Sequence, residues 1–208
     1  MRREIMIALR ATVVTLILTG LVYPLAMTGA AQVLFHDKAN GSLVRDEKGT
    51  VIGSELIGQA FANPAYLQGR PSAAGNNGYD ATSSSGSNLG PTSKKLRDRV
   101  AGDVERLRKE NPEAPMPIPA ELVTTSASGL DPELSPQAAL WQAPRIARAR
   151  QVAPGRIAQV IESKVQGRDL GVFGEPRVNV LAVNRALDQQ FGKPAPVLPA
   201  ATTTAAAK

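Results

Sequence analysis

The chain has 208 residues, a formal net charge of +6 and no cysteine. This length allows one soluble domain with an anchor, or two very small domains. Without cysteine, the chain has no disulfides, thiolate metal sites or cysteine nucleophiles, and its single histidine, His36, is too few for the usual histidine zinc site. The basic balance favours anionic partners, such as lipid head groups or an acidic protein surface.

Residues 11–35 carry no charge and predict a transmembrane helix. At about 1.5 Å per residue, about 25 residues reach about 37 Å, which exceeds a hydrocarbon core of about 30 Å. Arg2, Arg3 and Arg10 precede this segment, so the positive-inside rule places residues 1–10 in the cytoplasm. The alternatives are a cleaved signal peptide and a buried core helix. The length of the apolar run and a poor Ala-x-Ala site favour a retained anchor.

This orientation predicts a single-pass protein of the cell inner membrane. Residues 36–193 then form an extracytoplasmic, periplasmic soluble domain. Residues 194–208 consist mainly of Pro, Ala and Thr with almost no charge, which predicts a disordered tail. Pro24 is expected to kink the membrane helix.

The first part of the soluble domain has weak periodicity. Two short apolar runs in residues 42–53 flank Asp46-Glu47-Lys48-Gly49, which is a hairpin pattern. Residues 53–61 predict a turn followed by a short helix. Residues 63–91 form a long polar stretch rich in Gly, Ser and Asn, and so long a loop in a small domain is either mobile or functional.

Helical patterns dominate from residue 93 onward. An apolar stripe predicts a helix over residues 93–111, which Pro112 closes; the stripe consists of Leu96, Val100, Val104 and Leu107. Residues 122–125 predict a short strand. Ser135-Pro136 is a typical helix start, and this helix is expected to continue to Arg150 with an irregularity at Pro144.

Two more elements follow before the tail. Residues 154–165 predict a helix that Gly167 ends. Residues 178–191 predict a last helix, with a strand followed by a helix as the alternative. The sequence therefore predicts an α+β protein. Its N-terminal transmembrane helix precedes a small, mostly helical soluble domain with a short β-hairpin or sheet.

The residues alone give no convincing active site. His36 lies at the end of the anchor segment, where a Ser-His-Asp triad is not expected. The glycine-rich turn 86–91 precedes a helix but lacks the Gly-Lys-Ser/Thr ending of a phosphate-binding loop. Few aromatic residues are present for stacking, so nucleic acid is not an expected partner. These observations favour an anchored accessory subunit over an enzyme.

Several segments become specific when they are taken together in order. They are 56–59 (LIGQ), 70–73 (RPSA), 87–91 (SNLGP), 128–132 (SGLDP), 138–150 (AALWQAPRIARAR) and 174–179 (GEPRVN). With the N-terminal anchor, they resemble the C subunit of the Kdp high-affinity potassium-transporting ATPase of bacteria. The resemblance covers roughly residues 1–191.

The resemblance implies a non-catalytic subunit of an inner-membrane complex. Its implied partners are a potassium channel-like subunit, a P-type ATPase subunit and a very small single-span subunit, together with membrane lipid. The implied role is to stabilise the assembly and, as a catalytic chaperone, to raise the ATP affinity of the pump subunit. No tightly bound cofactor is implied, since ATP enters through the pump subunit.

The resemblance also implies that Gln142 contacts ATP. The charge bias at the N-terminus, however, puts Gln142 on the opposite side of the membrane from cytoplasmic ATP. We therefore favour roles in assembly and at the ion entrance, with any effect on ATP affinity transmitted between subunits.

A clamp hypothesis follows, in which the outer domain caps the external mouth of the channel-like subunit. Its candidate interface lies in the 63–91 loop and the helix around residue 145, with candidates Arg70, Ser87, Asn88, Arg145 and Arg148. The default interpretation of the basic residues is a solvated helix face. The competing functions are a membrane-anchored periplasmic hydrolase and an envelope-binding module.

Overall fold

The computed structural model describes residues 1–195. The chain divides into two compact units, Met1–Ser54 and Glu55–Lys208. Of the tail predicted over residues 194–208, all but the first two residues lie outside the described part.

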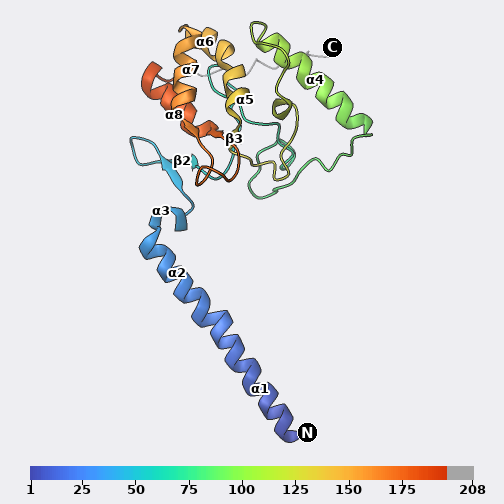
Figure 1. Cartoon of the computed structure of the whole chain (residues 1–208), viewed down its shortest axis with the longest axis vertical. Coiled ribbons are helices and arrows are strands. Elements are labelled where there is room, and N and C mark those ends of the chain that lie inside the picture. The colour runs from blue at the N-terminus through green and yellow to red at the C-terminus, as the bar shows by residue number, and fades with distance from the viewer. Residues whose placement is uncertain (196–208) are drawn as a thin grey trace, which may run out of the picture. The chain divides into compact units, whose positions relative to one another are not determined.

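The first unit begins with one long apolar helix (Figure 1). It consists of α1 (Arg2–Ile17), a π-helical segment η1 (Leu18–Val22) and α2 (Tyr23–Leu34). Within residues 1–195, this 33-residue helix is the one that is long and apolar enough to cross a membrane, and no residue of it is buried. A short helix α3 (His36–Ala39) follows.

The kink predicted at Pro24 is not present as a sharp bend, and a π-helical segment, η1, precedes the proline instead. Proline has no backbone N–H, and its ring crowds the preceding turn of a helix. The helix responds over Leu18–Val22 with wider π-type turns. The ribbon then continues without a sharp bend (Figure 1).

A hairpin closes the first unit, as predicted for residues 42–53. Strands β1 (Leu43–Arg45) and β2 (Val51–Ser54) pair antiparallel. In the turn, the Asp46 carboxylate accepts hydrogen bonds from the backbone N–H groups of Lys48 and Thr50, at 2.9 and 2.8 Å. Gly49 adopts a φ of +82°, which a side chain would strain.

The second unit packs helices over a small sheet. Its helices are α4 (Lys94–Glu110), the 3₁₀ turn η2 (Ala120–Leu122), α5 (Pro136–Trp141), α6 (Ala143–Arg150), α7 (Pro154–Ser163) and α8 (Val180–Phe191). The strands β3 (Glu133–Leu134), β4 (Val165–Gln166) and β5 (Arg177–Asn179) form an antiparallel sheet of order β3-β5-β4. The α+β prediction is confirmed.

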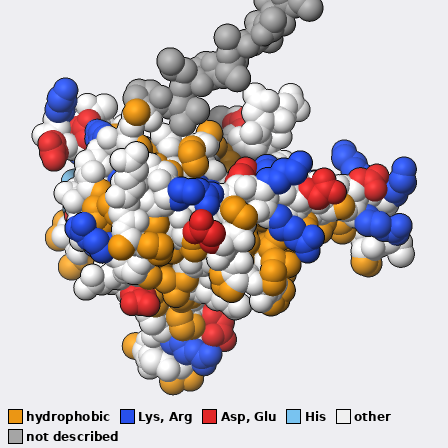
Figure 2. Space-filling model, turned by 90° about the horizontal axis from the view of Figure 1, so that it is seen from above, with side chains coloured by type: hydrophobic (Ala, Val, Ile, Leu, Met, Phe, Trp, Pro, Cys, Tyr) orange, Lys and Arg blue, Asp and Glu red, His pale blue; other side chains and the backbone are white. Residues whose placement is uncertain are grey.

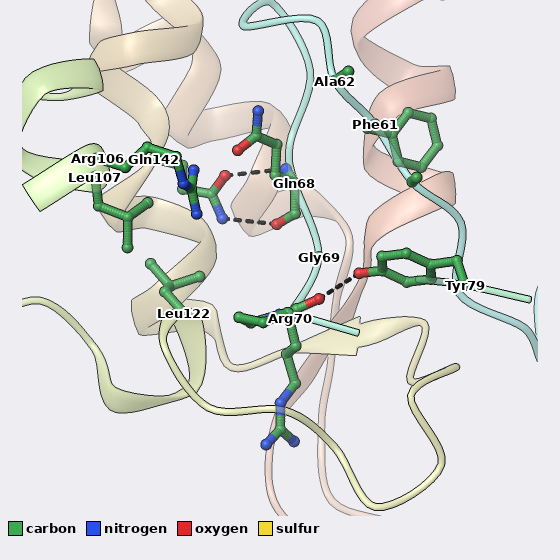
Figure 3. A pocket seen from close by; sticks show the side chains of 12 residues that line it. Phe61, Ala62, Gln68, Gly69, Arg70, Tyr79, Arg106, Leu107, Leu122 and Gln142 are labelled. Carbon is green, nitrogen blue, oxygen red and sulfur yellow. Dashed lines mark hydrogen bonds between the residues drawn. The ribbon is translucent and has the colours of Figure 1, made fainter. Parts of the chain in front are cut away.

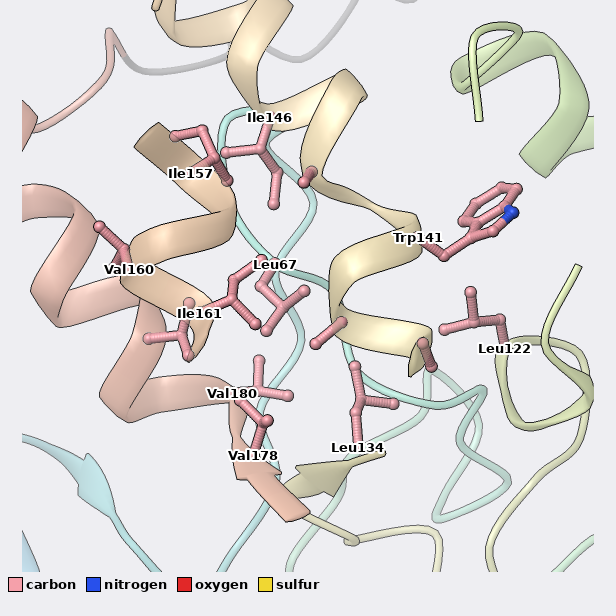
Figure 4. Close-up of a cluster of buried hydrophobic side chains, with 14 of the residues drawn as sticks. Leu67, Leu122, Leu134, Trp141, Ile146, Ile157, Val160, Ile161, Val178 and Val180 are labelled. Carbon is pink, nitrogen blue, oxygen red and sulfur yellow. The ribbon is translucent and has the colours of Figure 1, made fainter. Parts of the chain in front are cut away.

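One aliphatic core joins these elements, and the long loop contributes to it. Leu67 is fully buried and lies between α5 and α7 (Figure 4). Ile146, Ile157 and Ile161 of α6 and α7 are also fully buried. The 63–91 segment is therefore a packed part of the domain rather than a surface addition to it.

The predicted helix over residues 93–111 is present as α4. Ser93 caps it, because its hydroxyl accepts a hydrogen bond from the Leu96 backbone N–H at 3.4 Å. Leu107 is buried, and Val100 and Val104 pack against the core. The opposite face carries basic and acidic side chains interspersed along the helix, which Figure 2 shows at the projecting end of the domain.

The predicted irregularity at Pro144 splits one expected helix into α5 and α6. Pro144 has no N–H with which to continue the hydrogen-bond ladder, so the chain turns at the preceding residues. Gln142 is both the C-cap residue of α5 and the N-cap residue of α6. This break determines where its side chain points.

Two sequence predictions are wrong. Residues 53–61 contain no helix, because their backbone bonds to other segments: the Gly58 N–H donates to the Leu130 carbonyl at 2.8 Å, and the Glu55 carbonyl accepts from the Asn179 amide at 2.9 Å. Residues 122–125 are not a strand. Leu122 is the last residue of the 3₁₀ turn η2, and the Thr124 hydroxyl donates back to the Ala120 carbonyl at 3.0 Å.

Two helix boundaries also differ from the prediction. Helix α7 ends at Ser163, and Val165 belongs to β4 instead. At the C-terminal end the alternative of a strand followed by a helix is correct. Asn179 ends β5 and caps α8, since its side-chain oxygen accepts from the Ala182 N–H at 2.9 Å.

Candidate functional site

Gln142 holds the long loop against the helices. Its side chain is only 2% exposed. The amide oxygen accepts from the Gln68 backbone N–H at 3.0 Å, and the amide nitrogen donates to the Gln68 carbonyl at 2.9 Å (Figure 3). The side chain thus pairs with the loop backbone as a neighbouring strand would.

Asn184 of α8 also pairs its side-chain amide with the backbone of the loop. This α8 residue is 2% exposed. Its side-chain oxygen accepts from the Leu67 N–H at 2.7 Å, and its nitrogen donates to the Leu67 carbonyl at 2.9 Å. Two buried amides therefore satisfy the backbone groups of two successive loop residues, which would otherwise be costly to bury.

Arg145 completes this arrangement. It is 3% exposed, and its guanidinium donates to the carbonyls of Pro64 and Tyr66 at 2.6 and 3.1 Å and to the Gln142 amide oxygen at 2.7 Å. Burial lowers the pKa of Arg145 to about 10, so it still carries its proton at neutral pH. We call Gln142, Arg145 and Asn184 the loop clamp, and residues 64–68 the clamped segment.

Arg150, the last residue of α6, adds further contacts between the clamped segment and α8. It donates to the Ala65 carbonyl at 2.8 Å, pairs with Asp188 at 2.8 Å, and lies 5.2 Å from the centre of the Tyr66 ring. The Tyr66 hydroxyl donates to Asp188 at 2.8 Å. Burial, followed by this hydrogen bond, raises the pKa of Tyr66 to about 12. The phenol therefore stays protonated as a donor at physiological pH.

The next part of the loop is fixed by a second set of contacts. Arg70 forms an ion pair with Asp131 at 3.1 Å and lies within 3.4 Å of the Thr124 and Thr125 carbonyls. The Tyr79 hydroxyl donates to the Arg70 carbonyl (Figure 3), and burial raises the pKa of Tyr79 to about 12. The loop was predicted to be either mobile or functional. These contacts hold it in one conformation and therefore argue against the first alternative.

A small open cavity lies where the loop meets α4 (Figure 3). Its volume is about 220 Å³, below the roughly 300–1,000 Å³ typical of small-molecule sites. Both cations on its wall already have carboxylate partners: Arg70 pairs with Asp131, and Arg106 pairs with Asp103 and Glu110. The cavity therefore has little capacity for an anionic ligand such as a nucleotide.

The sequence-predicted site residues separate into two groups. Gln142 and Arg145 come together inside the domain. Arg148, on the same helix as Arg145, is 46% exposed; it donates to the Glu110 carbonyl and lies 3.7 Å from the Glu113 carboxylate. Ser87 is half-buried and Asn88 exposed, and Asn88 has a left-handed φ of +50°.

Asn184 is the clamp residue that sequence reasoning missed. The signal was a polar residue within the apolar face of the last helix, next to Val183 and one turn before Leu187, both fully buried. A buried asparagine in such a position requires hydrogen-bond partners. The sequence does not say that they lie 117 positions away.

Residues 1–195 show no grouping of side chains typical of a catalytic or metal site. No group of three or more His, Asp or Glu side chains in this range is placed to hold a metal ion. His36 lies in the first unit, where its ring contacts Asn40. The fold and the loop clamp thus define a class of protein: a helix able to span a membrane, joined to a small α+β domain whose buried polar groups hold its own loop.

Residues 5–189 match the family described as KdpC: K+-transporting ATPase, c chain, and the chain belongs to this family. It is 63% identical to a potassium-transporting ATPase KdpC subunit of Myxococcus xanthus, over 89% of this chain and 87% of the relative. The subunit of the same name from Methylobacterium nodulans is 55% identical, over 85% and 92%. That of Bradyrhizobium diazoefficiens is 52% identical, over 93% and 100%.

The resemblance inferred from the sequence is therefore confirmed. The chain is a subunit of a potassium-transporting ATPase complex and is not itself the catalytic subunit.

Proposed function

We propose that this chain stabilises the assembly of an ATP-driven potassium uptake complex. Its partners in this proposal are a channel-like subunit, a P-type ATPase subunit and a very small single-span subunit. The observation that carries the proposal is that the buried polar groups of the domain bond to its own loop. Such a domain offers a rigid, shaped surface rather than reactive groups.

The long helix supports an anchoring role. None of its residues is buried in the chain alone, so in a membrane its apolar side chains face lipid or helices of other subunits. We propose that the helix crosses the inner membrane with Arg2, Arg3 and Arg10 on the cytoplasmic side. The domain then lies on the side opposite the ATP.

A direct contact between Gln142 and ATP is disfavoured by this arrangement. The Gln142 amide already makes both of its backbone bonds with Gln68, and breaking them would leave buried polar groups unpaired. Any rise in the ATP affinity of the pump subunit, the catalytic chaperone role, would instead pass through contacts between subunits.

We propose that the outer surface of the 63–91 loop, together with Arg148 of α6, meets the channel-like subunit. Arg70, Ser87, Asn88 and Arg148 are the exposed or half-exposed candidates for this contact. Arg145 is buried, so in this proposal it does not touch the partner and instead fixes the conformation of the clamped segment.

Single cysteines test both the orientation and the contact, because the chain has none of its own. In spheroplasts, a membrane-impermeant maleimide should label Ser87→Cys without disruption of the membrane. Co-expression of the partner subunits should slow this labelling several-fold, because the contact covers the loop. Glu162→Cys, at an exposed position of α7, should be labelled at the same rate with and without partners.

Arg2→Cys provides the control for the cytoplasmic side, and it should react only after the membrane is opened. If Ser87→Cys also requires an opened membrane, the proposed orientation is wrong. If partners leave its labelling rate unchanged, the loop is not the contact.

A further inference from the structure

The connection between β4 and β5 carries an unusual set of exposed apolar side chains. Leu170 is 90% exposed, Val172 70% and Phe173 64%, which makes them the most exposed large apolar residues of the described part of the second unit. We call these three residues the apolar tip. The connection extends from the sheet at the end of the domain away from α6 (Figure 1). Apolar groups clustered in this way indicate an interaction site.

The backbone of the tip is fixed by its own hydrogen bonds. Asp169 and Phe173 exchange two backbone bonds, in which the Asp169 N–H donates at 2.8 Å and the Phe173 N–H at 2.9 Å. Leu170 has a φ of +53°, in the left-handed region that a branched apolar residue rarely adopts. A tip held in this shape loses little conformational entropy on binding.

Ion pairs surround the base of the tip. Arg168 pairs with Glu175 at 2.8 Å, and Arg177 pairs with Asp169 at 3.3 Å and with Glu133 at 3.1 Å. We call these five residues the charged collar. An apolar centre inside a polar rim is the arrangement found at energetically important positions of protein interfaces.

The collar also distinguishes protein from lipid as the occupant. Elements that insert into anionic membranes combine apolar residues with unpaired Lys and Arg. Here each arginine of the collar is paired, and the carboxylates of Asp169 and Glu175 would approach the anionic head groups. The charge pattern therefore favours a protein pocket with an apolar floor and a polar edge.

We propose that the apolar tip inserts into an apolar pocket on another subunit of the transport complex. This inference rests on the proposed function, because it names a contact through which the assembly is stabilised. It places that contact outside the 63–91 loop. The tip leads through β5 directly into α8, which carries Asn184, so the same rigid framework supports both surfaces.

The test compares recovery of the complex with the full chain and with a double variant, Leu170→Asn with Phe173→Ser. Asparagine tolerates the left-handed conformation at position 170, so the turn is retained while the apolar surface is lost. Recovery of the partner subunits should fall about tenfold or more, the size expected for removing two central interface residues. Met116→Ser, which removes a residue that is 59% exposed elsewhere in the unit, should leave recovery unchanged.

Emission from Trp141, which is buried and is the single tryptophan, reports whether each variant is folded. A folded double variant that recovers the complex as well as the full chain does would overturn the inference and leave the proposed function intact. Failure of the unchanged chain to recover any partner would instead contradict the proposed function.

A Phe173→Trp variant identifies the occupant. In the assembled complex, the emission that this variant gains over the unchanged chain, which has Trp141 alone, should be protected from an aqueous quencher and unaffected by brominated lipid. In the isolated full chain in vesicles, the aqueous quencher should reach it. Quenching by brominated lipid would show that the tip enters the membrane, and protection that grows with chain concentration alone would show self-association. Either result would overturn the inference.

Discussion

Replacing Arg145 with methionine should lower the free energy of unfolding by about 3 kcal/mol. The change removes a buried guanidinium that donates to the carbonyls of Pro64 and Tyr66 and to the Gln142 amide oxygen. The two carbonyls would lose their donor, and the Gln142 amide oxygen would keep only its bond from the Gln68 N–H, while removal of a desolvated charge offsets part of the loss. Denaturant unfolding of the full chain in detergent, followed by Trp141 emission, measures the effect.

Arg148→Met is the matched control on the same helix. Arg148 is half-exposed, and its pairing with Glu113 is long at 3.7 Å. Its replacement should cost less than about 1 kcal/mol, as is usual for exposed ion pairs. Equal losses for the two variants would contradict the role assigned to the loop clamp.

Gly129→Ala should destabilise the second unit by about 3 kcal/mol or more. Gly129 has a φ of +67°, and an added Cβ would lie 2.7 Å from both the Ala74 nitrogen and the Ser85 carbonyl oxygen. These are backbone atoms of the long loop, so they cannot move aside by a change of side-chain rotamer. The loop would have to leave the turn at Gly129, and the same denaturation experiment detects this loss.

Gly174→Ala separates backbone strain from the steric contact. Gly174 has a similar φ of +75° but no atom within 4 Å of the added Cβ. Its replacement should cost only the left-handed strain, about 1–2 kcal/mol. The loss of unfolding free energy in Gly129→Ala, beyond that in Gly174→Ala, then measures how closely the loop packs against Gly129. Equal losses in the two variants would show that the loop moves away from position 129 at little cost and would contradict close packing there.

The elements predictable from the sequence are those with a strong local signal. The α4 helix has both a cap at Ser93 and an apolar stripe, and the break between α5 and α6 follows from Pro144. The three strands of the second unit contain only two or three residues each, too few to show an alternating pattern. The β-branched run after Leu122 therefore predicted a strand where the chain instead leaves a 3₁₀ turn without forming one.

The site was predictable only in part, because its contacts are long-range. The loop was recognisable by composition, and Gln142 and Arg145 were singled out by family resemblance and by charge. Their actual partners are backbone groups 74 to 81 residues away, which no local pattern encodes. Charge alone suggested a solvated face for Arg145, and the structure instead gives it three internal acceptors.

The most direct test of the central claim is recovery of the transport complex with and without this chain. Partner subunits would be co-expressed with the full chain, with residues 1–54 alone, or with neither, and potassium-stimulated ATPase activity measured after purification. We predict that the partners are recovered together and active only with the full chain. Equal recovery and equal activity in its absence would contradict a role in holding the complex together.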